Sequence, residues 1–285
     1  MEDIYIIKIS KLDLNKLKDR GGKMENKIVD FFYFSGTGNT LLVVKKMAET
    51  FEKNEITVNL HKIEESNHED VNLEHTIGIA FPVAVLSTYP FVWNFIKSLP
   101  ESKGTEIFMV DTLAGFSGGI VGPMREIVKK KGYNPIGACE IIMPPNVFYI
   151  QDKETCDKKV QKGLLLAEKY ALDLINKKAE WGRVPVLSDV MYLISIGSLK
   201  ITEIDLHQKW FIFNPNKENC NKCNICIDLC PVENIKTGSD GYPEHDLNCE
   251  YCLRCVSFCP RGAMPAKFNY KGKTYRGVKA KEFLK

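Results

Sequence analysis

Short apolar runs alternate with segments of helical periodicity over residues 27–178. The runs are rich in β-branched and aromatic residues, which favours strands buried on both faces, as parallel strands are. They are Ile28–Phe34, Ile56–Leu60, Thr76–Phe81, Glu106–Val110 and Ile136–Met143. The pattern predicts helices over Thr40–Phe51, Pro90–Ser98 and Gly119–Lys131, and a further helix around Val160–Leu174, whose apolar residues share one face. We therefore expect an α/β domain with an open parallel sheet and helices on both sides.

A loop rich in hydroxyl groups follows the first expected strand and ends at a helix. It consists of Ser35, Gly36, Thr37, Gly38, Asn39 and Thr40. Its glycines permit a tight turn, and the free N–H groups and dipole of a helix N-terminus favour an anion. A Walker A loop would end in Gly-Lys-Ser/Thr, and a dinucleotide fingerprint would have a third glycine where Leu41 stands. The loop therefore predicts a phosphate site without a basic residue, with a polar-capped turn as the alternative.

Ser-Gly-Thr-Gly-Asn-Thr resembles the phosphate loop of flavodoxins, in which hydrogen bonds hold the phosphate of FMN. The resemblance implies a doubly wound five-stranded sheet of order 2-1-3-4-5, with the flavin at the carboxyl ends of its strands. Residues 82–88 and 112–119 would then border the flavin ring, with the segment after the fifth strand, residues 143–146, as a weaker candidate. The candidate ring contacts are Pro82, Val83, Ala84, Thr112, Gly115, Phe116, Ser117 and Gly118. Tyr89 or Phe116 would stack on the ring, although an aromatic residue there is more often part of the core.

Eight of the ten cysteines fall between Cys220 and Cys259, and they form an internal repeat. The spacing C-x2-C-x2-C-x3-C-P occurs twice with an offset of 29 residues. No export signal precedes it, so this clustering indicates metal binding rather than disulfides. A pair of zinc knuckles is the alternative, but zinc explains neither the third cysteine of each half nor the repeated Cys-Pro.

The same spacing is that of bacterial two-cluster ferredoxins, in which the fourth cysteine of each half reaches the other cluster. By this resemblance, Cys220, Cys223, Cys226 and Cys259 bind one [4Fe–4S] cluster, and Cys249, Cys252, Cys255 and Cys230 bind the other. Such a domain should not fold without its clusters. Because cysteine fills every ligand position, we expect the clusters to relay electrons rather than bind a substrate.

Composition and charge predict the domain boundaries, and they argue against nucleic-acid binding, a membrane span and secretion. We expect a doubtful extension over 1–23, with Met24 as a possible start, a flavodoxin-like domain over 24–178 and a connector over 179–215. A small α+β ferredoxin domain over 216–267 and a basic tail over 268–285 would follow, the tail as solvated surface or as a docking site. The net charge of +3 gives no support for nucleic-acid binding. No apolar run approaches the ~18 residues of a membrane span, and no secretory pattern is present, so we expect a cytoplasmic protein.

Over residues 24–267 the chain resembles fused flavodoxin–ferredoxin proteins of anaerobes. The resemblance implies an electron carrier that passes electrons between FMN, two [4Fe–4S] clusters and an external redox protein. Joining the centres in one chain keeps donor and acceptor at a high effective concentration. Two alternatives stay open: a flavin-dependent reductase of a small molecule, and a ferredoxin carried on a docking domain without flavin. The sequence assigns no catalytic residue, since no triad or Cys-His arrangement is recognisable.

Overall fold

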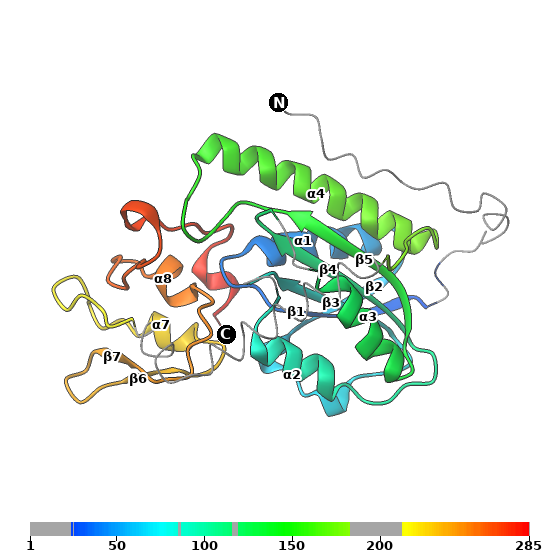
Figure 1. Cartoon of the computed structure of the whole chain (residues 1–285), viewed down its shortest axis with the longest axis horizontal. Coiled ribbons are helices and arrows are strands. Elements are labelled where there is room, and N and C mark those ends of the chain that lie inside the picture. The colour runs from blue at the N-terminus through cyan, green and yellow to red at the C-terminus, as the bar shows by residue number, and fades with distance from the viewer. Residues whose placement is uncertain (1–23, 25, 85–86, 116–118, 183–212, 285) are drawn as a thin grey trace.

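The computed structural model describes residues 24, 26–84, 87–115, 119–182 and 213–284. The expected extension 1–23 and most of the connector lie outside the described residues. Figure 1 shows a large part built on a sheet, and beside it a smaller part that holds α7, β6, β7 and α8. Among the described residues, no helix is long and apolar enough to cross a membrane.

The large part is a flavodoxin-like parallel sheet. Its strands are β1 (Ile28–Tyr33), β2 (Thr57–Lys62), β3 (Thr76–Pro82), β4 (Glu106–Leu113) and β5 (Asn134–Ile142). All neighbouring pairs are parallel, and their order is β2-β1-β3-β4-β5. This confirms the predicted order. The chain adds β2 on one side of β1 and the later strands on the other side, so the strand order switches between β1 and β3.

Helices cover both faces of the sheet and bury a separate apolar core on each. Helices α1 (Asn39–Glu52) and α4 (Lys153–Ile175) pack on one face, and α2 (Pro90–Ser98) and α3 (Val121–Lys130) on the other. Residues of β1 alternate between the cores, with Phe31 in the first and Phe32 in the second. Helix α4 begins earlier than its apolar face suggests, because the Asp152 carboxylate accepts the Thr155 N–H at 2.8 Å and caps the helix.

The expectation that every strand is buried on both faces holds for the central strands and is wrong for the edges. β1, β3 and β4 are almost fully buried, whereas β2 and β5 have several exposed residues. An edge strand has a neighbour on one side alone, and the helices cover its outer half less completely. Apolar content by itself does not distinguish these two positions.

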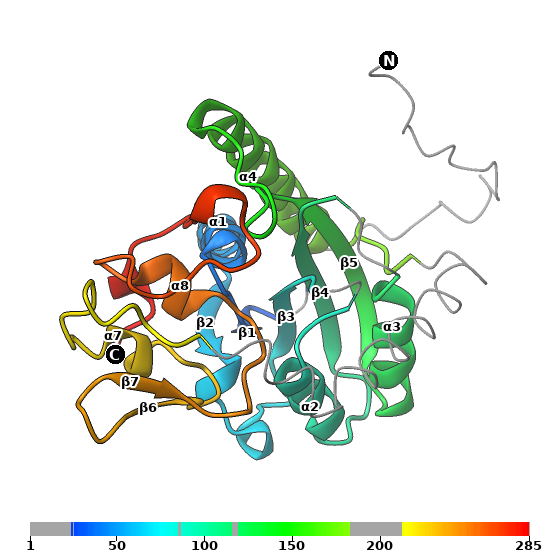
Figure 2. The same cartoon turned by 60° about the vertical axis from the view of Figure 1, so that its left-hand side comes forward.

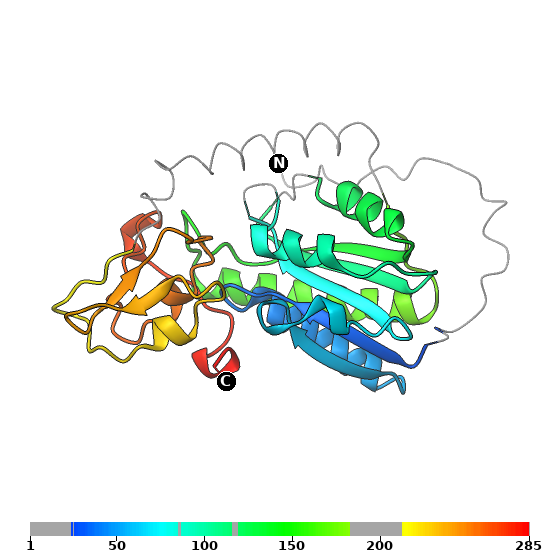
Figure 3. The ribbon, with the colours of Figure 1, turned by 90° about the horizontal axis from the view of Figure 1, so that it is seen from below.

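The small part contains two short helices and a hairpin. Helices α7 (Ile225–Asp228) and α8 (Arg254–Phe258) flank the strands β6 (Ile235–Thr237) and β7 (Pro243–His245), which pair antiparallel. Figure 3 shows this part at the end of the sheet toward which the strand arrows point. It therefore lies at the carboxyl edge, where a doubly wound sheet binds ligands.

The C-terminal segment after residue 267 packs against both parts. Phe283 is 3% exposed and meets the Phe258 ring at 5.3 Å, and both belong to the core beneath α1. Figure 2 shows the red C-terminal segment passing α1 and α8, with the end of the chain near α7. Most of its lysines and arginines are exposed, as the solvated-surface interpretation expects, but its buried aromatic residues join the two parts.

Candidate functional site

The loop between β1 and α1 is buried and has unused N–H groups. Gly38 has a φ of 109°, which glycine adopts without strain. In the part of the chain that the structure describes, no acceptor bonds the backbone N–H groups of residues 36–40. Five successive buried donors at the start of a 14-residue helix form a site that suits an anion. These residues suit a phosphate group, such as that of a flavin nucleotide, which would supply redox chemistry if it bound here.

The side chains of this loop are held in place by distant segments. Asn39 Nδ2 donates to the Pro144 carbonyl at 2.9 Å, and Thr37 Oγ1 accepts from Asn146 Nδ2 at 3.1 Å. The Thr40 and Thr112 hydroxyls lie 2.8 Å apart. The segment after β5, a weaker candidate for the rim of the ring site, thus contacts the phosphate loop itself.

The C-terminal segment covers the outside of the same loop. Tyr275 Oη donates to Asn39 Oδ1 at 2.7 Å, and the Gly277 N–H donates to the Thr37 carbonyl at 2.7 Å. A Cβ added to Gly38 would lie 2.8 Å from Val278. The tail therefore closes the loop from outside without occupying its N–H groups.

The loops predicted to border the flavin ring are more exposed to solvent than the loop between β1 and α1. Pro82, Val83 and Ala84 are half-buried, and the Val83 N–H donates to the Thr112 carbonyl at 2.8 Å. Gly115 is exposed, with no atom within 4 Å of an added Cβ. Phe116, Ser117 and Gly118 lie outside the described residues. Tyr89 packs edge-on to Phe34 at 5.1 Å and is 7% exposed, so it belongs to the core.

The eight cysteines line two separate cavities in the small part. One cavity is lined by Cys230, Cys249, Cys252 and Cys255, and the other by Cys220, Cys223, Cys226 and Cys259. Each cavity thus combines three cysteines of one half with the fourth of the other. Among the described residues, no three His, Cys, Asp or Glu side chains are arranged to hold a single metal ion. Four cysteines around each cavity match the ligand set of a [4Fe–4S] cubane.

The backbone repeats around the two cavities as the sequence does. Lys222 and Asn224 have φ values of 57° and 59°, and Tyr251 and Leu253, 29 positions later, have 57° and 64°. A left-handed residue of this kind costs about 1 kcal/mol. Because four such residues occur at matching positions, both cysteine loops have the same backbone conformation around their cavities.

Hydrogen bonds to sulfur follow the same repeat. The Asn234 N–H points to Cys230 Sγ, and the Ala263 N–H to Cys259 Sγ, each at 3.2 Å. Burial raises the pKa of the Cys226 and Cys249 thiols to about 11, so without a metal they are neutral thiols at physiological pH. Binding iron would release their protons.

Arg254 ties the second cysteine loop to the phosphate loop. Its side chain is 4% exposed; Nε donates to the Ser35 carbonyl at 2.9 Å, and one amino group pairs with the buried Glu64 carboxylate. Its guanidinium lies over the Phe34 and Phe283 rings, 4.8 and 4.5 Å from their centroids. The sequence repeat could have drawn attention to Arg254, because the matching position in the first half is the apolar residue Ile225.

Two further contacts bring this cysteine loop onto the carboxyl edge of the sheet. A Cβ added to Gly36 would lie 2.5 Å from the Cys252 carbonyl oxygen. Glu250 Oε1 accepts the Phe91 N–H at 3.2 Å and so caps α2; burial raises the pKa of this carboxyl to about 7, although the hydrogen bond opposes the shift. Sequence reasoning missed these contacts, since no local pattern marks them.

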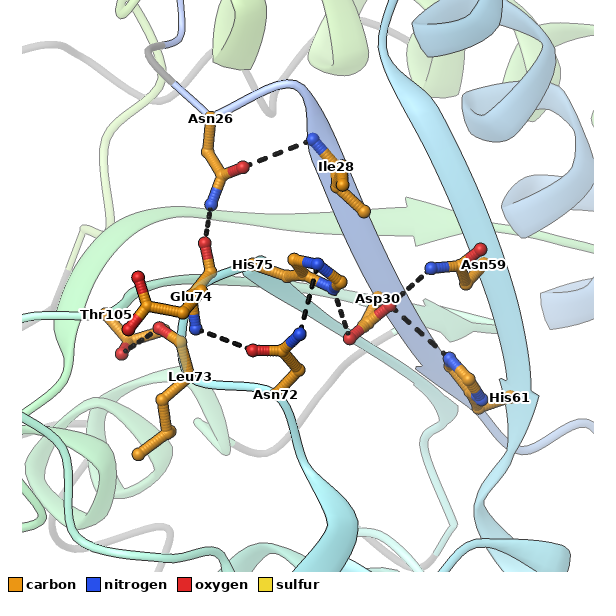
Figure 4. A network of polar contacts seen from close by, with 10 residues as sticks. All are labelled: Asn26, Ile28, Asp30, Asn59, His61, Asn72, Leu73, Glu74, His75 and Thr105. Carbon is orange, nitrogen blue, oxygen red and sulfur yellow. Dashed lines mark hydrogen bonds and ion pairs between the residues drawn. The ribbon is translucent and has the colours of Figure 1, made fainter.

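A second polar cluster lies away from this edge (Figure 4). Asp30 Oδ2 lies 2.9 Å from His75 Nδ1, and Asn59 Nδ2 donates to Asp30 Oδ1 at 2.8 Å. His61 Nε2 lies 3.5 Å from the same carboxylate. Burial opposes ionisation of Asp30, but these partners outweigh it and lower the pKa of the carboxyl. These contacts link β1 to β2 and to the residue that precedes β3.

Comparison with known proteins identifies the small part. Residues 213–277 match the family model of the 4Fe-4S dicluster domain. The small part is a 4Fe-4S dicluster domain. The match begins and ends beyond the expected limits of 216 and 267, and it takes in Tyr275 and Gly277, which contact the phosphate loop.

Relatives match single parts of this chain. An archaeal-type glutamate synthase [NADPH] of Dehalococcoides mccartyi is 33% identical over 61 residues, which is 21% of this chain and 12% of the relative. A solved flavodoxin from the domain Archaea has 14% identity and a TM-score of 0.39 over 52% of this chain and 98% of its own. Rubredoxin oxygen:oxidoreductase of Desulfovibrio gigas has 16% identity and a TM-score of 0.37, over 53% of this chain and 38% of its own. The chain joins a doubly wound parallel sheet of order β2-β1-β3-β4-β5 to a 4Fe-4S dicluster domain.

Proposed function

We propose that this protein carries electrons between an FMN on the phosphate loop, two [4Fe–4S] clusters in the cysteine-lined cavities, and an external redox protein. The observation that supports it is the contact between Cys252 and Gly36. This contact sets a cysteine of one cavity against the loop proposed for the flavin phosphate. Donor and acceptor would then stay adjacent without having to meet by diffusion.

In this proposal the protein's own residues bind and enclose the cofactors. The N–H groups of residues 36–40 bind the phosphate, and Pro82–Ala84, Thr112 and Gly115 border the flavin ring. Cys220, Cys223, Cys226 and Cys259 hold one cluster, and Cys230, Cys249, Cys252 and Cys255 hold the other. A cluster fully ligated by cysteine exchanges single electrons and leaves no iron open to a substrate.

The composition of the purified protein tests the proposal. Anaerobic purification should yield two clusters' worth of iron and acid-labile sulfide, with one FMN per chain or stoichiometric uptake of added FMN. Iron and sulfide without any FMN uptake would contradict the flavin assignment. Zinc in place of iron would contradict the cluster assignment.

A pair of threonine variants tests the phosphate loop directly. Thr37→Val removes a hydroxyl next to the unused N–H groups, so FMN should bind about tenfold more weakly, the equivalent of one hydrogen bond to a charged group. The control is Thr50→Val in α1, the helix that follows the loop, where the Thr50 hydroxyl donates to the Lys46 carbonyl at 2.9 Å. Titration of flavin fluorescence measures both; equal affinities for the two variants would argue against phosphate binding in this loop.

A ferredoxin on a docking domain without flavin is the second candidate. This candidate needs no flavin for the packing of Cys252 and Val278 against Gly36 and Gly38, which by itself holds the two domains together. The composition measurement separates the candidates, since this second one predicts two clusters and no uptake of FMN.

A further inference from the structure

The two cysteine cavities differ in what surrounds them. The segment 249–254, here called the proximal loop, packs on the carboxyl edge of the sheet. Cys252 contacts the aromatic core beneath α2, Glu250 caps that helix, and Arg254 bonds to the Ser35 carbonyl. Every one of these contacts is with the flavodoxin-like domain.

The segment 220–224, here called the distal loop, faces outward. Cys223 is exposed, and so are its neighbours Asn221 and Lys222. Lys222 lies over the Tyr242 ring at 4.2 Å and donates to the Asp240 carbonyl at 2.8 Å, and both partners belong to the dicluster domain itself. The two loops occupy matching positions in the sequence repeat. The docking of the domains covers the proximal loop, whose residues are buried or half-buried, and leaves residues 221–223 of the distal loop exposed.

From this asymmetry we infer that the two loops have different tasks in the proposed electron transfer, on which the inference rests. The proximal loop is the contact through which electrons cross between the two domains. The distal loop, around Cys223, is the contact through which they cross to an external one-electron redox protein. The rate of electron tunnelling falls steeply with distance, so each cavity serves the centre that its own loop approaches.

Each crossing moves a single electron. The donor is oxidised by one electron, the acceptor is reduced by one, and no covalent bond forms or breaks. The external protein supplies or removes the electrons, so the sequence of crossings needs no further reactant. Arg254 is a positioning residue in this scheme, because it fixes the proximal loop to Ser35 without reaching a reacting atom.

Electron paramagnetic resonance of the reduced full-length protein tests the inference without relying on activity. Cys223→Ser and Cys252→Ser assign the two cluster signals, and if one variant fails to assemble, the other assigns both signals by difference. A water-soluble dysprosium chelate should then speed the relaxation of the signal altered by Cys223→Ser. The signal altered by Cys252→Ser should relax at its original rate. Equal effects on both signals, or a larger effect on the Cys252 signal, would overturn the assignment.

Uptake of FMN tests the other half of the inference. Adding FMN to flavin-depleted protein should change the relaxation or the reduction potential of the Cys252 signal and leave the Cys223 signal unchanged. A change in the Cys223 signal alone would overturn the inference. A protein that takes up no FMN refutes the proposed function and, with it, the crossing between domains. The chelate measurement is independent of FMN and still decides which loop faces solvent.

Discussion

Replacing Arg254 by methionine should destabilise the joined domains strongly. The substitution keeps much of the side-chain length but removes hydrogen bonds to Ser35 and Leu229 and the ion pair with Glu64. The Glu64 side chain is 5% exposed, and its Oε2 has no hydrogen-bond partner among the described residues, so the carboxylate would stay buried and unpaired. Breaking a buried pair in this way costs about 3–5 kcal/mol. The two lost cation–π contacts add about 1 kcal/mol or more in all.

Urea unfolding under anaerobic conditions, followed by tryptophan fluorescence, measures this loss. Arg276→Met is the matched control, because Arg276 is an exposed arginine of the same chain. The double variant Arg254→Met with Glu64→Leu should recover much of the stability, since removing both charges leaves neither unpaired. If Arg254→Met unfolds like the control, or if the double variant is no more stable than the single one, the buried pair does not hold the domains together.

Three further substitutions test other contacts. Gly36→Ala should lower the free energy of unfolding by about 1–3 kcal/mol, because its Cβ would collide with the Cys252 carbonyl, whereas Gly115→Ala meets open space; equal urea midpoints would refute the contact. Tyr275→Phe should cost about 1 kcal/mol by removing the hydrogen bond to Asn39, and thermal unfolding beside Tyr270→Phe, an exposed tyrosine, checks it. Burial raises the pKa of Asp111 well above its usual value, so between its unfolded and folded pKa values this carboxyl is protonated in the folded protein and ionised in the unfolded chain. Over that interval the wild type should lose up to about 1.4 kcal/mol per pH unit relative to Asp111→Asn as pH rises, and urea titrations over a series of pH values with parallel profiles for the two proteins would contradict this.

Local patterns were enough to predict the elements of the sheet and the presence of a dicluster domain. The alternation of apolar runs with helical periodicity predicted five parallel strands, because a strand buried on both faces needs apolar residues at nearly every position. The loop at Ser35–Thr40 was recognisable because a strand, a glycine turn and a helix N-terminus follow one another directly. The cysteine spacing was equally informative, since cluster ligands on one turn must lie close together in the chain. The edge positions of β2 and β5 escaped this reasoning, because burial there depends on a neighbour that strand composition does not reveal.

By itself, then, the sequence determined the sheet, the turn between β1 and α1 and the repeat of eight cysteines, each of which rests on residues close in the chain or on an exact repeat. The tertiary structure decided how these units meet. Arg254 reaches Ser35 across 219 residues, and Tyr275 reaches Asn39 across 236. Such contacts arise when preformed surfaces dock, so they depend on shape and orientation rather than on any periodicity. The two cysteine loops have the same sequence pattern but differ in solvent exposure because of this docking. The loop at Cys252 packs against the sheet, and the loop at Cys223 stays exposed.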